Sequence, residues 1–361
     1  MSVQTIPQPD AVVTERQAGA RRAIAVWLFA VASLVFLMVI VGGATRLTDS
    51  GLSITEWRPV TGAIPPLSAA DWQAELEKYR QIPEYKLVNR GMSLDEFKRI
   101  YWWEWGHRLL GRLIGVAFLV PFVWFVATRR IERALVPGLL AMFALGGLQG
   151  GLGWYMVMSG LSERVDVSQY RLAAHLGLAV VIYGYMLWVA LGLWRTDTPR
   201  QEAAPRGLRQ GAVALVVLIF LQIIAGAFVA GLDAGLTYNS WPLMDGAWVP
   251  GGLLDLSPWW RNAFENLLTV QFNHRLLGYV LAAAALWHYW RARSTARAGT
   301  AGAVLIAVLC QIALGIWTLL AVVPIGLGLA HQAGALIVFT AALVHARALN
   351  APAHAPALRG V

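Results

Sequence analysis

Eight stretches of this chain are apolar and long enough to cross a lipid bilayer as helices, which takes about 20 residues each. A chain with that pattern cannot cover itself with polar surface: it is 58% hydrophobic and 14% charged, whereas a soluble domain carries roughly 25% charged residues. These values exclude an ordinary cytosolic enzyme, a disordered chain and a fibrous repeat. The predicted spans cover residues 24–44, 105–128, 135–158, 170–194, 211–231, 272–290, 300–322 and 326–346.

Arginines give these spans a direction. They cluster at every second connection between spans, which the positive-inside rule assigns to the cytoplasm, so both termini are predicted to be cytoplasmic. Orientation in the membrane therefore accounts for most of the net charge of +9, and nucleic-acid binding is not predicted. The arginines are Arg16, Arg21, Arg22, Arg129, Arg130, Arg133, Arg195, Arg200, Arg206, Arg209, Arg291, Arg293, Arg297, Arg347 and Arg359.

The two halves of the chain repeat each other. Glu104-Trp-Gly-His-Arg-Leu-Leu-Gly111 matches Gln271-Phe-Asn-His-Arg-Leu-Leu-Gly278, and the loop that starts at Asp49 matches the loop that starts at Asp233. Four spans per repeat is an even number, so both repeats cross the membrane in the same direction. The sequence thus predicts an all-α integral membrane protein with eight transmembrane helices, arranged as two tandem four-helix bundles related by a pseudo-two-fold axis along the membrane normal.

The duplication also predicts the domain organisation. The N-terminal half carries a long outer segment, residues 45–103, which could cover its site or meet a partner. The predicted units are a cytoplasmic tail (1–23), an N-terminal four-helix half (24–194), a cytoplasmic linker (195–210), a C-terminal four-helix half (211–346) and a second cytoplasmic tail (347–361).

Four histidines occupy matched positions in the repeats. His107, His175, His274 and His331 lie in the first turns of the second, fourth, sixth and eighth spans, all predicted just beneath the outer surface. Ionisable groups within a span are costly and usually functional. Zinc would need further ligands around one point, whereas two imidazoles on separate helices suit axial ligation of a haem iron. The sequence therefore predicts one haem site in each half.

Small and basic residues accompany these histidines. Gly111 and Gly278 lie one turn below His107 and His274, where they either leave space for a flat macrocycle or permit close helix packing. Arg108 and Arg275 follow the same two histidines, where a guanidinium could bind haem propionates or extend to the headgroup region.

One difference between the repeats changes the chemistry. Glu104 shares a helix face with His107, but the matching residue in the second half is Gln271. A carboxylate can move protons and an amide cannot, so the first half is predicted to catalyse and the second to hold a fixed electron-transfer haem. The alternative is that Glu104 only caps the start of its helix.

The remaining candidate residues receive structural interpretations. His288 and His345 fall at cytoplasmic helix ends, where we expect them to extend to the interface or cap a helix. Cys310, the single cysteine, is expected to be a small apolar core residue, and it excludes an intrachain disulfide.

Taken together, these motifs resemble haem A synthase, in the branch found in mitochondria and related Gram-negative bacteria. The resemblance covers about residues 24–346, and this chain lacks the outer-loop cysteine pair of the Gram-positive branch. Its specific segments are Gly42-Gly-Ala-Thr-Arg-Leu-Thr-Asp-Ser-Gly-Leu-Ser53, Glu56-Trp-Arg-Pro-Val-Thr-Gly-Ala-Ile-Pro-Pro66, Tyr101-Trp-Trp-Glu-Trp-Gly-His-Arg-Leu-Leu-Gly111 and the four-histidine pattern.

The resemblance implies an oxidoreductase that converts the C8 methyl group of haem O into the formyl group of haem A, through two hydroxylations and loss of water from a gem-diol. It implies that His274 and His331 hold a low-spin haem b, with Arg275 and Gly278 beside it. It also implies that His107 and His175 flank the substrate haem and that Glu104 removes a proton or stabilises a carbocation. Haem O carries a farnesyl tail, for which a lateral opening in the first half is expected.

The expected location is the bacterial inner membrane, with both haem sites near the periplasmic side. Expected partners are haem O, membrane lipid and an electron-transfer partner, with haem O synthase, oxidase assembly factors and a second copy of the chain as further candidates. The alternative functions are a two-haem b-type cytochrome for electron transfer and, less favoured, a transporter with parallel repeats and broken spans.

Overall fold

The computed structural model describes residues 9–162, 164–194 and 204–350, and the side chains from residue 17 onward. Long helices dominate, and the described residues contain no β-strand. The helices are α1 (Pro9–Leu47), η1 (Thr61–Ala63), α2 (Ala69–Tyr79), α3 (Pro83–Leu87), α4 (Leu94–Ala127), η2 (Arg133–Leu135), α5 (Val136–Ser162), α6 (Gln169–Trp194), α7 (Arg206–Gly231), η3 (Ala234–Leu236), η4 (Trp259–Arg261), α8 (Asn262–Glu265), α9 (Leu267–Ala292), α10 (Ala298–Leu320) and α11 (Ile325–Leu349).

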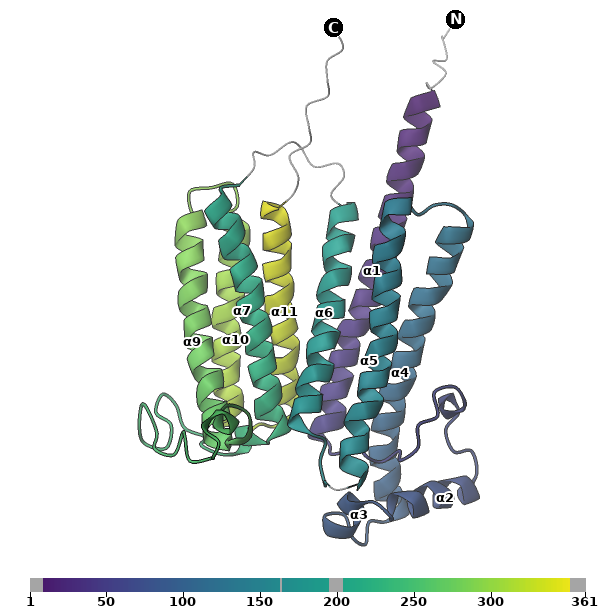
Figure 1. Ribbon diagram of the computed structural model, residues 1–361, viewed down its shortest axis with the longest axis vertical. Helices are drawn as coiled ribbons and strands as arrows, with labels where there is room; N and C mark the ends of the chain where they lie inside the picture. Colours follow the sequence, from purple (N-terminus) through teal and green to yellow (C-terminus); the bar gives the residue numbers. More distant parts are fainter. Residues whose placement is uncertain (1–8, 163, 195–203, 351–361) are drawn as a thin grey trace, which may run out of the picture.

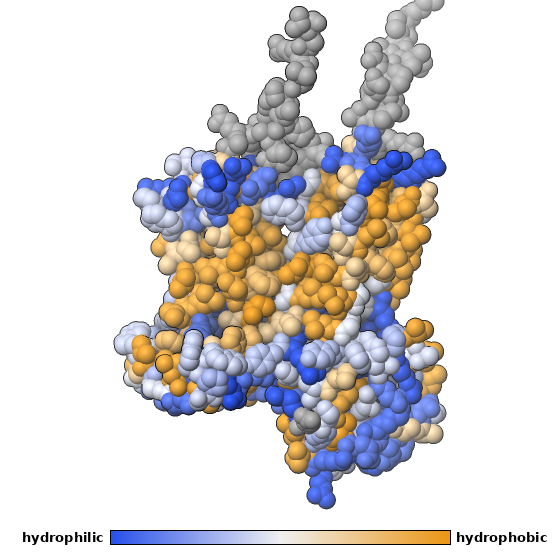
Figure 2. All heavy atoms as spheres, in the orientation of Figure 1, coloured by the Kyte–Doolittle hydropathy of each residue, from blue (hydrophilic) through white to orange (hydrophobic). Residues whose placement is uncertain are grey.

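The long helices stand side by side in two groups, with α1, α4, α5 and α6 in one and α7, α9, α10 and α11 in the other (Figure 1). The short helices α2 and α3 lie beyond one end of the first group. Figure 2 shows an apolar belt around the middle of the molecule between two polar zones, as expected of a helical membrane protein.

Among the described residues, seven helices are long and apolar enough to cross a membrane, namely α1, α4, α5, α6, α7, α10 and α11. The predicted span 272–290 lies inside α9, which is 26 residues long but is not one of the seven. Polar residues at both ends of α9, including Gln271, His274 and Arg275, lower its hydropathy.

Several helix boundaries differ from the predicted ones. The segment 17–23 of the predicted first tail is helical, and α4 begins at Leu94, so helix replaces the last turns of the predicted outer segment. A capping box explains the start of α4, since Ser93 accepts from the Glu96 backbone and Glu96 accepts from the Ser93 backbone. Residues 195–203 of the predicted linker, 1–8 of the first tail and 351–361 of the second tail lie outside the described residues.

The two groups meet through α1, α6, α7 and α11. The Tyr183 hydroxyl on α6 lies 2.7 Å from the Thr340 hydroxyl on α11, and the Gln332 amide on α11 donates to the Val39 carbonyl on α1 at 2.8 Å. Gly184 lets α6 approach closely, because a β-carbon there would lie 3.0 Å from the Phe339 ring. The apolar core is continuous across this contact.

Two structural expectations are wrong. Cys310 is exposed on α10 rather than buried, which places it on the apolar outer surface of the bundle. His288 and His345 do not extend outward: they are 5% and 1% exposed, and their Nε2 atoms lie 2.8 Å apart. The Thr300 hydroxyl, 2.8 Å from Nδ1 of His345, completes a buried polar chain, as a buried imidazole requires.

Candidate functional site

The four predicted histidines all lie near the helix ends that carry the long loops. His107 is on α4, His175 on α6, His274 on α9 and His331 on α11, and all four are partly buried. The structure brings them together as two pairs, one in each helix group. Among the described residues, no three His, Cys, Asp or Glu side chains are grouped so that they could hold a metal ion.

The pair in the second group has the spacing that a haem requires. The ring centres of His274 and His331 are 6.4 Å apart, and the ring planes make an angle of 77°. Metal–imidazole bonds are about 2 Å long and each ring centre lies about 1 Å behind its nitrogen, so two axial imidazoles on one iron have centres about 6 Å apart. The inner pair, His288 and His345, is too close for this, with ring centres 5.0 Å apart.

The pair in the first group has the corresponding placement. His107 and His175 lie within electrostatic range of each other. Each of the four histidine rings packs against a glycine of the neighbouring helix, where a β-carbon would come within 2.7–3.2 Å of a ring atom. The pairs are Gly42 with His107, Gly153 with His175, Gly226 with His274 and Gly315 with His331.

Three of the four histidines share a further partner that the sequence interpretation missed. The side-chain amide of a glutamine, four residues before the glycine, donates to the histidine's own carbonyl at 2.6–3.0 Å and lies 3.1–3.2 Å from Nδ1. The repeated Gln-x-x-x-Gly spacing was the available signal. The pairs are Gln149 with His175, Gln222 with His274 and Gln311 with His331.

His107 is the exception. The residue four positions before its glycine, Gly42, is Met38. Met38 contacts the Gly111 side of α4, where a β-carbon would lie 3.0 Å from the Met38 methyl, just as Gln222 contacts Gly278 in the other half. A thioether is only a weak acceptor, so it cannot replace the amide hydrogen bonds. The predicted haem-lining glycines Gly111 and Gly278 thus contact a neighbouring helix in both halves.

The acid–amide difference lies in a clamp between loop and helix. Glu104 is 2% exposed, and its carboxylate accepts from the Ser53 hydroxyl at 2.8 Å, the Ile54 backbone at 2.7 Å and Arg108 at 2.6 Å. Three donors thus face this carboxylate. Because its position is well inside α4, the interpretation of Glu104 as a helix cap is wrong.

Gln271 makes the matching clamp. Toward the loop it donates hydrogen bonds where Glu104 accepts them, and toward the arginine both residues accept. Its amide nitrogen donates to the carbonyls of Ala234 and Thr237, both at 2.7 Å, and its oxygen accepts from Arg275 at 2.8 Å. Asp49 and Asp233, which begin the two duplicated loops, both adopt left-handed backbone conformations, with φ of 48° and 52°. The repeats therefore agree in backbone and differ in charge.

The two arginines bind the duplicated loops in the same way. Arg108 donates to the carbonyls of Ile54 and Glu56 at 2.8 and 3.0 Å, and Arg275 donates to the carbonyls of Tyr238 and Ser240 at 2.8 and 2.9 Å. The guanidinium groups hold the loops over the histidine pairs. Their predicted contact with haem propionates stays a prediction.

An outer cap covers the first group. Its small core packs Tyr79 and Phe97 around Glu84, which is only 5% exposed. Burial, followed by the negative charges of Asp49, Glu104 and Asp166, raises the pKa of Glu84 to about 8. Burial also raises the pKa of Tyr79. The cap thus holds a carboxyl group that is neutral at neutral pH.

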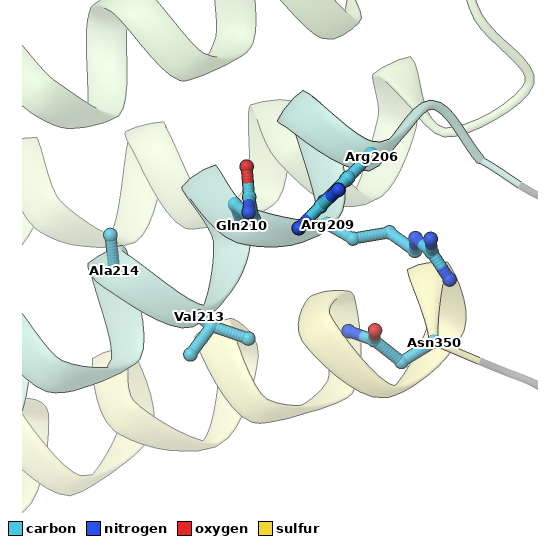
Figure 3. A pocket seen from close by; sticks show the side chains of 6 residues that line it. All are labelled: Arg206, Arg209, Gln210, Val213, Ala214 and Asn350. Carbon is cyan, nitrogen blue, oxygen red and sulfur yellow. The ribbon is translucent and has the colours of Figure 1, made fainter.

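A further cavity lies away from this site. It has a volume of about 440 Å³ and opens between the start of α7 and the end of α11, where Arg206, Arg209 and Asn350 line it (Figure 3). It is at the opposite end of the helices from the four histidines. Nothing connects it with the candidate site.

The sequence profile of the cytochrome oxidase assembly protein family (COX15-CtaA) matches residues 25–343. The chain belongs to this family.

Similar proteins carry the name Heme A synthase. The protein of Parvibaculum lavamentivorans is 59% identical over 344 residues, which are 95% of this chain and 98% of the relative. Those of Rhodospirillum centenum and Nitrosospira multiformis are 54% and 51% identical, and each alignment covers 95% of this chain and 92% or 97% of the relative. The predicted resemblance is thereby confirmed.

Proposed function

We propose that this protein is a haem A synthase, an oxidoreductase that converts the C8 methyl group of haem O into the formyl group of haem A. The observation that carries the proposal is a duplicated pair of histidines, one with the 6.4 Å ring separation of two axial ligands, in a chain 51–59% identical to proteins of that name. No observation favours the two-haem cytochrome, and the continuous long helices do not fit a transporter with broken spans.

The second half fits a permanently bound haem b. His274 and His331 would hold the iron, and Gln222 and Gln311 would orient the two rings, as partners of metal-ligating histidines do. The glycines opposite the rings provide the necessary room. When bound, this haem supplies a redox group that accepts and passes on electrons.

The first half would bind the substrate. Conversion of a methyl to a formyl group takes one oxygen atom from water and releases four protons and four electrons, so the site has to stabilise positive charge and remove protons. His107 and His175 would lie on opposite faces of haem O. Glu104, one turn from His107, places a buried negative charge beside the reacting macrocycle.

The role of Glu104 follows from its hydrogen bonds. Ser53 and Ile54 occupy the two lone pairs of Oε2 and Arg108 occupies one of Oε1, so the buried, oriented carboxylate is placed to stabilise a cationic centre on the substrate. A carboxylate has about four lone-pair sites, so Oε1 keeps one that can take a proton. The clamp therefore fits both carbocation stabilisation and proton removal.

The membrane arrangement is part of the proposal. We assign α9 as an eighth transmembrane helix, and the two helix groups as four-helix bundles related by a pseudo-two-fold axis along the membrane normal. The matched clamps, glycines and loop conformations support this relation. The arginine-rich helix ends would face the cytoplasm, and the histidine pairs would lie near the periplasmic side of a bacterial inner membrane.

Expression in cells that make haem O tests the function. Extracted haems are separated by chromatography from cells with the wild-type chain, with His107→Ala and with His274→Ala. Haem A with the wild type only, and haem O accumulation with both variants, would support the proposal. Absence of haem A with the wild type, together with two stably bound haems of similar spectrum, would establish the cytochrome instead.

A further inference from the structure

The two helix groups differ in how their second and third long helices meet. In the second group α9 packs against α10 along much of its length, whereas in the first group α4 and α5 meet at few points. A cavity of about 350 Å³ lies between α4 and α5 toward their inner ends, lined by Phe122, Val123 and Leu140 among other apolar residues. The first group is therefore open on one side toward the apolar belt.

Glycines keep this side open. Alignment of Gln149 with Gln311 pairs Gly146 with Val308 and Gly150 with Ile312. Val308 is 1% exposed, and Ile312 packs against the core, so these side chains fill the second group. Gly146 and Gly150 are exposed, and a β-carbon at either one would have no described neighbour within 4 Å.

The facing helix shows the same difference. Gly115 on α4, two turns from His107, also has no described neighbour within 4 Å of its β-carbon position. The matching residue of the second half is Ala282, which packs against the core. The space beside the histidines of the first half is thus present on both α4 and α5, and neither helix fills it.

We propose that the open face between α4 and α5, with Gly115, Gly146 and Gly150 along it, is a lateral groove that binds the isoprenoid tail of the substrate haem and admits it from the bilayer. This inference rests on the proposed function. An isoprenoid chain prefers lipid to water, so a prenylated haem has to enter and leave sideways. A permanent cofactor needs no such route, which agrees with the filled counterpart in the second half.

The choice of occupant follows from position. Gly115 lies two turns from His107, and the cavity farther along α4 and α5 has an apolar lining, as a hydrocarbon tail attached to that macrocycle requires. A membrane phospholipid would also present a hydrocarbon chain, but nothing polar in the lining marks a headgroup site. The tail of the substrate is therefore the occupant that the experiment tests, with phospholipid as its competitor.

The second half supplies the variants for the test. Gly146→Val combined with Gly150→Ile copies Val308 and Ile312 into the groove, and the open space around both glycines predicts normal folding. Gly147→Leu is the control, because its counterpart Leu309 is 51% exposed on the outside of the bundle. Haem O and protohaem, which lacks the isoprenoid tail, are titrated into each purified protein in lipid nanodiscs, and Soret absorbance reports binding.

The double variant is expected to bind haem O at least about tenfold more weakly, with a change of less than about threefold for protohaem and for the haem b content. Gly147→Leu is expected to match the wild type. Three outcomes would each overturn the groove assignment. The double variant could bind haem O as tightly as the wild type, or it could lose affinity for haem O and protohaem equally. It could also displace phospholipid without any change in haem O binding. Loss of haem b would contradict the open space on which the inference depends. A wild type that never binds or converts haem O would refute the proposed function separately.

Discussion

The N-terminal and C-terminal helix groups share one arrangement of helices and loops, but they differ in how completely side chains fill the space between the helices beside the histidines. Both have a clamp of loop, arginine and carboxamide or carboxylate, and both place histidines against glycines. Only the second group fills its space, with Val308 and Ile312 beside the site. At its inner end His288 and His345 pack together, where the first half has Pro121 and Val189.

Under the proposed function, the filled second group would be a holding site and the open first group an exchanging one. A filled bundle with oriented ligands favours slow release of its haem, whereas an open bundle with one less restrained ligand favours exchange. Gene duplication can supply both kinds of site from one fold, because a small number of substitutions is enough. They change how far side chains fill the bundle and the charge at the Glu104 and Gln271 positions, and they leave the clamp between loop and helix in place. The comparison can be tested at each of these substitutions.

The largest effect is expected from removal of a histidine ligand. His274→Ala should lower tightly bound haem b at least about tenfold, because one of the two iron ligands of the filled half is lost. His107→Ala should leave the haem b content close to that of the wild type. Pyridine haemochrome analysis of the purified proteins measures both, and equal loss in the two variants would contradict the separation into holding and exchanging halves.

Exchange of the acid and the amide comes next. Glu104→Gln should lower haem A formation about 100-fold if the charge acts on the substrate. Its amide would also point a donor at either the Ile54 backbone or Arg108, so thermal unfolding of the variant has to be measured alongside. An active Glu104→Gln enzyme would reduce Glu104 to a structural clamp.

The reciprocal change serves as the control for that experiment. Gln271→Glu places a carboxylate against the carbonyls of Ala234 and Thr237, so it should destabilise the second half without a direct effect on chemistry. Destabilisation of both variants with equal loss of haem A would indicate that only the folding of the clamps matters.

A smaller effect is expected from the residues that orient the rings. Gln222→Met removes the amide beside His274 and should weaken haem b retention about tenfold. Met38→Gln introduces the missing amide beside His107 and should slow release of the first-half haem by a similar factor. Haem transfer to apomyoglobin measures both rates, and unchanged transfer in both variants would show that the amides do not position the ligands.

The sequence was sufficient to predict the duplicated motifs and the polar residues that interrupt apolar spans. The four histidines, the Glu104–Gln271 difference and seven of the expected spans could be found because each breaks a simple pattern of hydropathy or duplication. The glutamine partners carried a signal of the same kind, a repeated Gln-x-x-x-Gly spacing, but its meaning depends on which helices are neighbours.

Other features depend on packing that no local pattern contains. Cys310 and Val308 lie on one apolar helix, yet one is exposed and the other buried, because the surrounding membrane and the protein core are both apolar. The buried contact of His288 with His345 arises from two helices 57 residues apart in sequence. The cap around Glu84 likewise requires tertiary contacts between short helices.

The last prediction concerns the outer loop regions of the two halves, which should respond to pH in opposite directions. Burial raises the pKa of Glu84 to about 8, above the value of about 4.3 in an unfolded chain. The folded cap therefore binds the proton more tightly, and its stability falls as pH rises from about 4 to about 8, by at most about 1.4 kcal/mol per pH unit.

Glu265 lies on α8, in the outer connection between α7 and α9 of the second half, and has the opposite behaviour. Its hydrogen bond from Arg261, followed by that from Tyr170, lowers its pKa. Its contribution to stability is therefore present above the unfolded-state pKa and is lost as pH falls through the lowered folded-state pKa.

Hydrogen exchange of residues 69–87 should show increasing opening between pH 5 and pH 8, after correction for the intrinsic rate. Glu84→Gln, which stays neutral and similar in shape, should remove that trend, while exchange near Glu265 stays unchanged. A wild-type cap with no such trend would mean that ionisation of Glu84 does not destabilise the cap. The regions around Glu84 and Glu265 would then not differ in their response to pH.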